Sequence, residues 1–384
     1  MNKALEPVKL RNIELKNRVV RSATQDYFGN HDGTVSEEQI KIHETLAANN
    51  IGLIITAHNY VTPAGKVSLD QNSISADLYI DGHKKQTEAV HKAGAKIIMQ
   101  ISHAGAGAME LDGNPPVAPS AVPIPFPASD ATPKALTAQE IEVIIQQFID
   151  AAVRVKKAGY DGVQVHGAHQ YLFSQFLNPV YNKRTDEYGG SVENRFRISE
   201  RAIAGIKKEL GEEFPVFLKV NSNIEENDEA YYDDLIYVAQ KCKDLGVEAI
   251  EYSGFNFTAL GRQGLRKYYL DRVAAVRKEV DIPAILVGGI RSFKDMDEVL
   301  DRGIDMVSIC RPFISEPDLI SKLIAGQEES RCLSCSKCWN RRAFLLGRPT
   351  STISTNRGRN RKMRLLAVRC TPALRVPAST PTRW

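Results

Sequence analysis

Residues 137–167 have the sequence TAQEIEVIIQQFIDAAVRVKKAGYDGVQVHG, and this stretch contains the unit from which the fold is predicted. Residues 137–159 repeat apolar side chains with a helical period, whereas GVQVHG (162–167) alternates like a buried strand. Thr137 and Glu140 have the spacing of a capping box, and Gly159 stands where a helix ends in a left-handed residue. The stretch therefore predicts a helix that leads into a strand.

The same unit recurs along most of the 384 residues. Strands are expected at 17–24, 52–61, 96–102, 162–167, 215–221, 249–254, 283–289 and 306–312. Helical patterns lie between them, among them 36–50, 137–159, 193–211 and 230–246, with a capping box at Ser36 and Gln39 and closing glycines at Gly94, Gly211, Gly246 and Gly303. Eight strand and helix pairs predict a parallel sheet closed into a (β/α)8 TIM barrel, an α/β fold. A doubly wound open sheet is the alternative, but eight units without a linker-like break favour closure.

The composition, with 43% hydrophobic and 25% charged residues, is that of a soluble globular protein. No run of about 18 apolar residues is present, and the N-terminal stretch has no secretory signal, so a cytoplasmic protein without a membrane partner is expected. Charge is divided unevenly, because residues 331–384 hold 13 Lys or Arg and no acidic residue, whereas residues 1–330 hold 37 basic and 46 acidic residues. Cys242 and Cys310 lie in apolar surroundings and are expected to be reduced packing residues.

Two insertions, 103–136 and 173–192, follow predicted strands. In a barrel of this type the C-terminal ends of the strands form the active-site face, so both insertions are expected to be lids or pocket walls.

Polar residues gather after the fourth predicted strand, where the sequence VHGAHQYL (165–172) places His166, His169 and Tyr171 close together. Two imidazoles that converge on one small polar atom can polarise a carbonyl or nitro oxygen, and a phenol beside them offers a proton. Two satisfied polar side chains in a loop, or half of a metal site, remain as alternatives.

The ends of the seventh and eighth strands predict a phosphate site. Gly288 and Gly289 allow backbone N–H groups to approach an anion, and Arg311, after Cys310, supplies a two-pronged donor. A tight turn beside a surface arginine is the alternative.

Gln100 and Lys219 lie inside predicted strands, where an unpaired amide or ammonium group costs several kcal/mol to bury. A flat ring rich in heteroatoms and carrying a phosphate would supply hydrogen-bond partners to both side chains. Lys219 also suits a Schiff base, as in barrel aldolases, or one half of an ion pair.

The ordered motifs resemble the old yellow enzyme family of FMN-dependent oxidoreductases, in its bacterial and dienoyl-CoA-reductase-like branch. The most specific segment is HGAHQYLFSQFLNPVYNKRTDEYGGSVENRFR (166–197), supported by NRVVRSAT, GLIITAHNYV, QISHAG and FLKVN. The resemblance covers residues 1–326, the expected FMN-binding barrel, and implies hydride transfer from the flavin to an activated alkene, with NADH or NADPH as reductant.

The resemblance also implies a role for each matching residue. Ser22, Ala23, Thr24 and Gln25 would line the flavin, Gln100 and Lys219 would bind its ring, and Gly288, Gly289, Cys310 and Arg311 would surround its phosphate. His166 and His169 would bind the acceptor oxygen, Tyr171 would donate the proton, and Tyr27 would contact the substrate.

Two residues depart from the family pattern. Gln25 replaces a cysteine or threonine, and His58 occupies a position that is usually small, where it would narrow the pocket or rotate away. The loop RTDEYGGS (184–191) is expected to be structural or to face a dimer partner, with Arg184 held by a carboxylate.

Cys332, Cys335 and Cys338, in the segment 327–340, have spacing that suits zinc or an iron–sulfur cluster, both of which need four ligands. The resemblance implies a [4Fe-4S] cluster here, but the gap between Cys335 and Cys338 is shorter than in the family and Cys370 is distant. Residues 341–384 are expected to be a disordered basic tail. Nucleic acid is not an expected partner, because no reading motif accompanies the charge.

Three functions follow from these patterns. The first is an FMN-dependent NAD(P)H oxidoreductase whose partner is a small-molecule electron acceptor, with a homo-oligomer left open. The second is a barrel lyase or aldolase that uses Lys219, and the third is a non-catalytic, redox-responsive flavoprotein.

Overall fold

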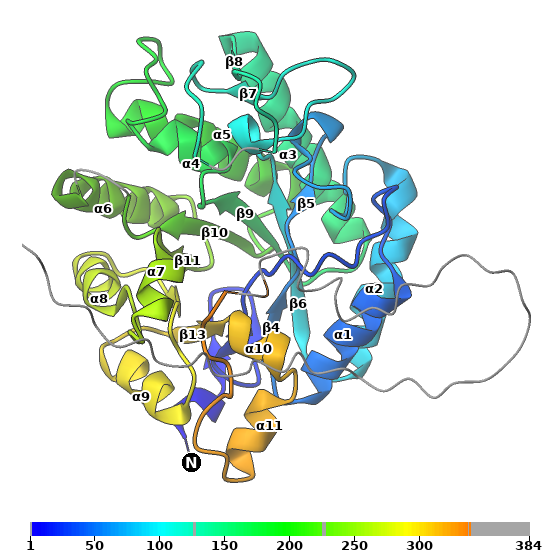
Figure 1. Cartoon of the computed structure of the whole chain (residues 1–384), viewed down its shortest axis with the longest axis vertical. Coiled ribbons are helices and arrows are strands. Elements are labelled where there is room, and N and C mark those ends of the chain that lie inside the picture. Colours follow the sequence, from blue (N-terminus) through cyan, green and yellow to red (C-terminus); the bar gives the residue numbers. More distant parts are fainter. Residues whose placement is uncertain (1, 126–127, 225–227, 337, 339–384) are drawn as a thin grey trace, which may run out of the picture.

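The computed structural model describes residues 2–125, 128–224, 228–336 and 338. Eight parallel strands form a closed barrel in the order β3, β4, β6, β9, β10, β11, β12, β13 and back to β3 (Figure 1). Their bounds are β3 (Val19–Arg21), β4 (Leu53–Ile55), β6 (Lys96–Ser102), β9 (Val163–Gly167), β10 (Val216–Asn221), β11 (Ile250–Ser253), β12 (Ala284–Val287) and β13 (Met306–Ile309). All eight expected strands are present, and the predicted TIM barrel is confirmed.

Helices surround the barrel in the expected alternation (Figure 1). They are α1 (Glu37–Ala48), α2 (Ile80–Lys92), α3 (Ala138–Lys157), α4 (Leu172–Leu177), α5 (Val192–Leu210), α6 (Asp228–Asp244), α7 (Phe257–Arg262), α8 (Leu270–Glu279), α9 (Phe293–Asp301), α10 (Arg311–Ser315) and α11 (Leu319–Ile324). Both predicted capping boxes, at the starts of α1 and α3, are formed. The glycines expected to end helices all have positive φ, which includes Gly94 at +82° and Gly159 at +80°.

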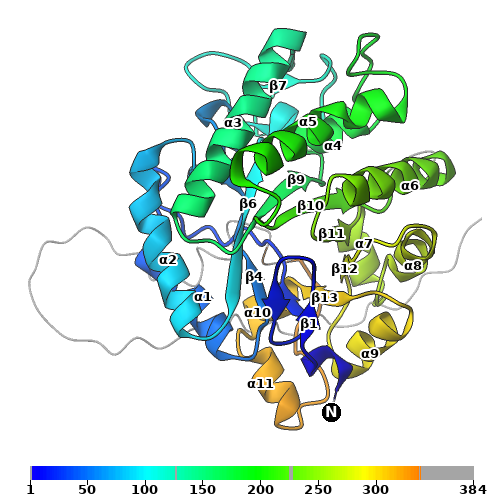
Figure 2. The same ribbon diagram turned by 180° about the vertical axis from the view of Figure 1, so that it is seen from behind.

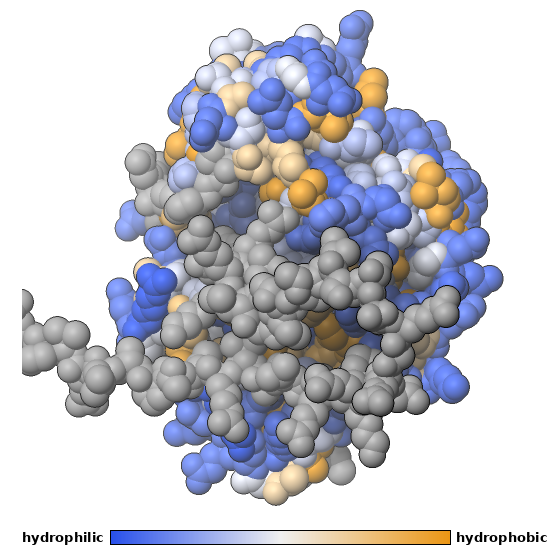
Figure 3. Space-filling view, turned by 45° about the vertical axis from the view of Figure 1, so that its right-hand side comes forward, coloured by the Kyte–Doolittle hydropathy of each residue, from blue (hydrophilic) through white to orange (hydrophobic). Residues whose placement is uncertain are grey.

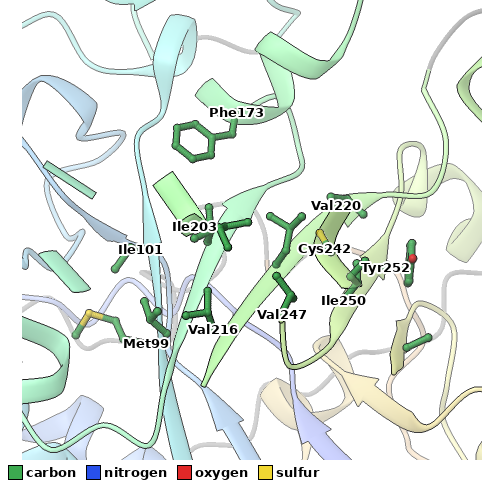
Figure 4. Packing of buried hydrophobic residues seen from close by; sticks show 14 of the residues in the cluster. Met99, Ile101, Phe173, Ile203, Val216, Val220, Cys242, Val247, Ile250 and Tyr252 are labelled. Carbon is green, nitrogen blue, oxygen red and sulfur yellow. The ribbon is translucent and has the colours of Figure 1, made fainter. Parts of the chain in front are cut away.

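The apolar core has two main parts, and a small third cluster is formed by side chains of the two long insertions, among them Ile124 and Tyr181. The larger one lies between the strands and the helices, and Figure 4 shows part of it, with Met99, Val216 and Tyr252 from the strands and Ile203 from α5. The smaller one fills the N-terminal half of the barrel interior with side chains such as Phe217. A hairpin of β1 (Val8–Lys9) and β2 (Glu14–Leu15) contributes its own apolar side chains to this cluster and covers that end (Figure 2). The interior at the opposite, C-terminal half is therefore left for polar groups.

The second predicted strand, 52–61, is wrong as a continuous element. It is divided into β4 and a short β5 (Asn59–Tyr60), because Asn59 turns its side-chain amide back to the carbonyl of Ala57, at 2.7 Å, and to the hydroxyl of Thr56. His58 lies at this interruption, where the chain leaves the barrel wall. The insertion 103–136 carries β7 (Val117–Ala118) and β8 (Lys134–Ala135), and 173–192 begins within α4.

Among the described residues, none of the helices has the length and apolar composition needed to cross a membrane. On the face shown in Figure 3 the described surface is mostly hydrophilic, and apolar side chains form small separate patches. The predicted basic tail, 341–384, which includes Cys370, lies outside the described residues.

Candidate active site at the barrel mouth

A cavity lies among the C-terminal ends of the strands. Its lining residues come from β3, β10, β11, β12 and β13 and from the loops that follow β9 and β12, and they include Ser22, Ala23, His169, Lys219, Ser253, Phe257, Tyr269, Gly288, Gly289, Arg291, Ser308, Cys310, Arg311 and Ser334. Strand ends that are far apart in the sequence thus meet around one space, as the sequence predicts.

One end of the cavity is a glycine cradle. Gly288 and Gly289 have φ values of +137° and +72°. A Cβ atom on Gly289 would lie 2.7 Å from the backbone nitrogen of Lys267 and 2.7 Å from the ring of Tyr268. Only glycine fits this backbone and this space, so the cavity-lining backbone packs closer to Lys267 and Tyr268 than any other residue would allow.

A cationic side chain faces the same end. The Arg311 guanidinium donates to the carbonyl of Ser334 at 3.2 Å, to the hydroxyl of Ser336 at 3.0 Å and to the hydroxyl of Tyr268 at 3.2 Å. None of the described carboxylates forms an ion pair with Arg311, so its positive charge is held by neutral acceptors only. A glycine cradle beside a cation without an acidic partner fits a phosphate group.

A buried polar network forms the floor of the cavity. Glu251, on β11, is fully buried and accepts hydrogen bonds from the hydroxyls of Ser22 and Ser308, both at 2.7 Å, and from Gln164 at 3.0 Å. The Lys219 ammonium lies 3.1 Å from Glu251 and 2.9 Å from the hydroxyl of Ser22. Burial alone raises the pKa of the Glu251 carboxyl, but Lys219 and the three donors outweigh it and hold the pKa below its usual value.

Gln100 belongs to this network and does not line the cavity. Its amide nitrogen donates to Gln164 at 2.7 Å, and Gln164 in turn donates to Glu251. The buried amide of Gln100 therefore has the hydrogen-bond partner that was expected, and this partner is a protein side chain, that of Gln164. Contact between Gln100 and a bound ring stays a prediction.

His166, His169 and Tyr171 lie together, and His169 is the one of the three that lines the cavity. The ring centroids of His166 and His169 are 5.5 Å apart, and those of His166 and Tyr171 are 4.4 Å apart. His169 has a left-handed backbone, with φ of +57°, and its Nε2 lies 2.8 Å from the hydroxyl of Ser253. Among the described residues, Nδ1 of His166 is buried without a hydrogen-bond partner. The sequence motif thus does bring its two imidazoles and its phenol together.

These side chains are neutral in the folded protein. Burial lowers the pKa of His169 to about 3 and that of His166 well below its usual value, with repulsion between neighbouring imidazoles and from Lys219 adding to the effect. Burial likewise raises the pKa of the Tyr171 hydroxyl. The three groups are therefore hydrogen-bond donors without net charge, which suits a carbonyl oxygen that gains negative charge during a reaction.

The remaining expected flavin and substrate residues lie beside the cavity. The Thr24 hydroxyl lies 3.0 Å from the sulfur of Cys310, and Gln25 contacts His58 and Ser68. Tyr27 has a left-handed backbone, with φ of +60°, and it contributes to the raised pKa of Tyr171. Their predicted roles remain predictions.

Several site residues were not identified from the sequence. Glu251 is the central acceptor of the floor, and Ser253, Phe257, Tyr269, Arg291 and Ser334 line the cavity. Glu251 and Ser253 are alternate residues of one predicted strand, and a carboxylate inside such a strand is the signal that would have pointed to them.

The cysteine segment does not form a metal centre in the described part of the chain. No three His, Cys, Asp or Glu residues are grouped closely enough there to hold a metal ion. The hypothesis of a cluster at Cys332, Cys335 and Cys338 therefore gains no support from the structure. As expected, Cys242 is buried and reduced, whereas Cys310 is half-buried and lines the cavity.

In the loop 184–191, the predicted contact of Arg184 with a carboxylate is present. Arg184 is held by the carboxylate of Asp186, with a 2.9 Å bond from its Nε. It also donates to the carbonyl of Pro119 at 2.9 Å, which ties the loop to the other long insertion.

Comparison with known proteins places this geometry among flavin-dependent reductases. A family model described as "NADH:flavin oxidoreductase / NADH oxidase family" matches residues 3–330. An NADPH dehydrogenase of Bacillus subtilis is 33% identical over 317 residues, which are 82% of this chain and 92% of the relative. An NADH oxidase of Thermoanaerobacter brockii is 34% identical over 366 residues, 91% of this chain but 56% of the relative.

Two solved structures are similar in fold. Morphinone reductase has a TM-score of 0.75 and 27% identity, over 85% of this chain and 91% of that chain. A 2-naphthoyl-CoA reductase, in complex with 2-naphthoyl-CoA, has a TM-score of 0.79 and 27% identity, over 87% of this chain and 54% of that chain. The chain thus spans about half the length of the larger relatives and nearly all of the smaller ones.

Proposed function

Because the chain belongs to the NADH:flavin oxidoreductase / NADH oxidase family, that of the old yellow enzymes, we propose that it reduces activated alkenes, using FMN and NADH or NADPH. Membership of this family confirms the predicted enzyme class, an FMN-dependent oxidoreductase. The observation that carries the choice of acceptor is that a glycine cradle, Arg311 and His169 line one cavity, and that His169 packs against His166, which in turn packs against Tyr171.

The residues present fit FMN. Gly288, Gly289 and Arg311 would hold its phosphate, since the cradle has no room for a Cβ and the guanidinium has no described acidic partner. Ser22 and Lys219 would face its ring. When bound, FMN supplies the two-electron chemistry that side chains lack, whereas the protein supplies orientation and electrostatics.

His166 and His169 are proposed to bind the carbonyl oxygen of the acceptor. Negative charge collects on this oxygen when hydride is added to the β-carbon, and each preorganised donor is worth about 3–4 kcal/mol in a dry site. The bond from Nε2 of His169 to Ser253 fixes the orientation of that ring, and His166 has a ring nitrogen without a described partner. Because both imidazoles are neutral, the site favours a neutral carbonyl compound.

Tyr171 is proposed to donate the proton that completes the reduction at the α-carbon. Its ring packs against His166, and the raised pKa of its hydroxyl keeps it protonated at neutral pH. A positioned proton donor contributes about two to four powers of ten in rate.

The two alternative functions, a barrel lyase or aldolase and a non-catalytic redox-responsive flavoprotein, fit the site less well. The Lys219 ammonium is bonded to Glu251 and Ser22, so it is not presented as a free amine to a carbonyl substrate. A purely redox-responsive flavoprotein would not need the neutral donor set. An iron–sulfur cluster, a homo-oligomer and a cytoplasmic location stay predictions and are not part of this proposal.

The test is a spectrum followed by the two half-reactions. The purified protein is expected to show flavin absorbance and to oxidise NADH or NADPH with 2-cyclohexenone as acceptor. Tyr171→Phe should leave flavin reduction unchanged and slow enone reduction by about 10²-fold or more. Tyr79→Phe is the matched control, because the Tyr79 hydroxyl bonds to the backbone carbonyl of Asp32 and interacts with Tyr60, and none of these residues lines the cavity. Protein that stays colourless with added FMN, or equal loss in both half-reactions, contradicts the proposal.

A further inference from the structure

A chain of hydrogen bonds leads from a backbone amide to the phenol of Tyr171. The N–H of Val67 donates to Oε1 of Gln71 at 2.7 Å, and Nε2 of Gln71 lies 2.8 Å from Nδ1 of His58. Nε2 of His58 then lies 3.1 Å from the hydroxyl oxygen of Tyr171 and 3.1 Å from Oε1 of Gln25.

The direction of these bonds is fixed at the backbone end. An amide N–H can only donate, so the Gln71 oxygen must face Val67 and its NH2 group must face His58. The NH2 group also can only donate, so Nδ1 of His58 carries no proton. Burial lowers the pKa of His58 to about 4, which leaves the ring neutral at physiological pH, with its single proton on Nε2.

The proton on Nε2 determines where the Tyr171 proton lies. Because Nε2 of His58 is a donor, the Tyr171 oxygen can only accept from it, and the phenolic O–H must point elsewhere. His166 packs against the same phenol, with ring centroids 4.4 Å apart, on the side of the acceptor-binding pair. The O–H group is thereby turned away from His58 and left available to a bound acceptor.

We propose that His58 is a positioning residue that orients the proton of Tyr171 toward the acceptor and stabilises the phenolate left after its transfer. The inference rests on the proposed function. In the step itself the O–H bond of Tyr171 breaks, a C–H bond forms at the α-carbon, and the electron pair stays on the phenol oxygen. That oxygen faces the Nε2–H of His58 at 3.1 Å until a proton from solvent restores it.

Gln25 belongs to the same arrangement. Its Oε1 shares the Nε2–H of His58, while its NH2 group is bonded to the hydroxyl of Ser68 at 2.7 Å. The two residues that depart from the family pattern, Gln25 and His58, therefore contact each other. Their joint occurrence is what a proton-orienting pair requires.

The test uses two substitutions of His58 in the full-length protein with its flavin. His58→Leu removes the donor, and Gln71 keeps an acceptor because its NH2 group also lies 3.2 Å from the His58 carbonyl. His58→Gln places an N–H donor near the former Nε2. Enone reduction should fall about 10- to 100-fold in the leucine variant and recover to within about threefold of the wild type in the glutamine variant. Reduction of ferricyanide, which takes up electrons without a proton, should stay unchanged in both.

Three results would overturn the inference. They are an enone rate in the leucine variant within twofold of the wild type, equal losses with enone and ferricyanide, and no recovery in a glutamine variant that binds flavin normally.

A second measurement does not depend on activity. Nitrogen-15 NMR of histidine-labelled protein, with the His58→Gln variant to assign the signal, should show His58 protonated on Nε2 only. A proton on Nδ1 would overturn the inference whatever the kinetics. A wild-type protein that has this tautomer but reduces no alkene would instead refute the proposed function and leave the hydrogen-bond arrangement intact.

Discussion

The ion pair beneath the cavity gives a prediction whose size follows from the structure. Glu251 is fully buried, and the Lys219 ammonium lies 3.1 Å away with an exposed side-chain fraction of 3%. At an effective dielectric constant of about 20, two charges at this distance attract each other by about 5 kcal/mol. Glu251→Gln removes this attraction and leaves a buried ammonium bonded to a serine hydroxyl.

We expect Glu251→Gln to lower the free energy of unfolding by about 3–5 kcal/mol, the usual effect of breaking a buried pair. For a barrel of this size the loss corresponds to a decrease in melting temperature of roughly 4–7 °C. It would be measured by urea unfolding of the protein without FMN, because Lys219 lines the cavity and a bound ligand would add stability.

The double variant Lys219→Met, Glu251→Leu is the matched control. It removes both charges, so it should be more stable than the sum of the single losses predicts, since no ion remains unpaired. The pKa of Glu251 is depressed in the fold, so its contribution is present above the unfolded pKa of about 4.3 and is lost as the pH falls. A Glu251→Gln variant within 1 kcal/mol of the wild type, or strictly additive losses in the double variant, would refute the reasoning.

Three further predictions concern other parts of the site. Arg311→Ala should weaken FMN binding by about 100-fold or more, with Arg311→Lys intermediate, in a fluorescence titration; equal affinities would remove Arg311 from the phosphate site. His166→Ala should weaken binding of phenols that mimic an enolate, whereas unaltered affinity would exclude it from the oxyanion role. Burial lowers the pKa of His58, His83 and His103 to about 4, so below about pH 6.5 these histidines bind protons in the unfolded chain but not in the folded protein. The free energy of unfolding should therefore fall as the pH decreases from 6.5 toward 4. A free energy of unfolding that stays constant over this range in urea unfolding would contradict the prediction.

Local patterns were sufficient to predict the barrel. Helix periodicity, the capping boxes of α1 and α3, and the closing glycines are determined by residues a few positions apart, so each could be recognised within a short window. The one strand that was predicted too long, 52–61, is interrupted by contacts of Asn59 with its own loop, and these depend on a side-chain direction that apolar periodicity does not encode.

The sequence was sufficient to predict some residues of the site but not others. Gly289, Arg311 and Lys219 stand at strand ends or inside strands, where the fold fixes their direction, and the structure places all three at one cavity. Glu251 was missed because its importance comes from partners on other strands: Ser22, Ser308 and Lys219 are each more than 30 positions away in the chain. Sequence spacing carries no information about such contacts.

His58 shows the limit of a family resemblance. The resemblance implies a small residue at this position, and so it supplies no role for an imidazole. The role proposed here follows from bond directions that begin at the backbone N–H of Val67 and pass through Gln71. Because a backbone amide cannot reverse its polarity, the tautomer of His58 and the direction of the Tyr171 proton are consequences of the fold. The chemistry proposed for this site therefore depends on a loop contact more than a hundred positions from the tyrosine that it orients.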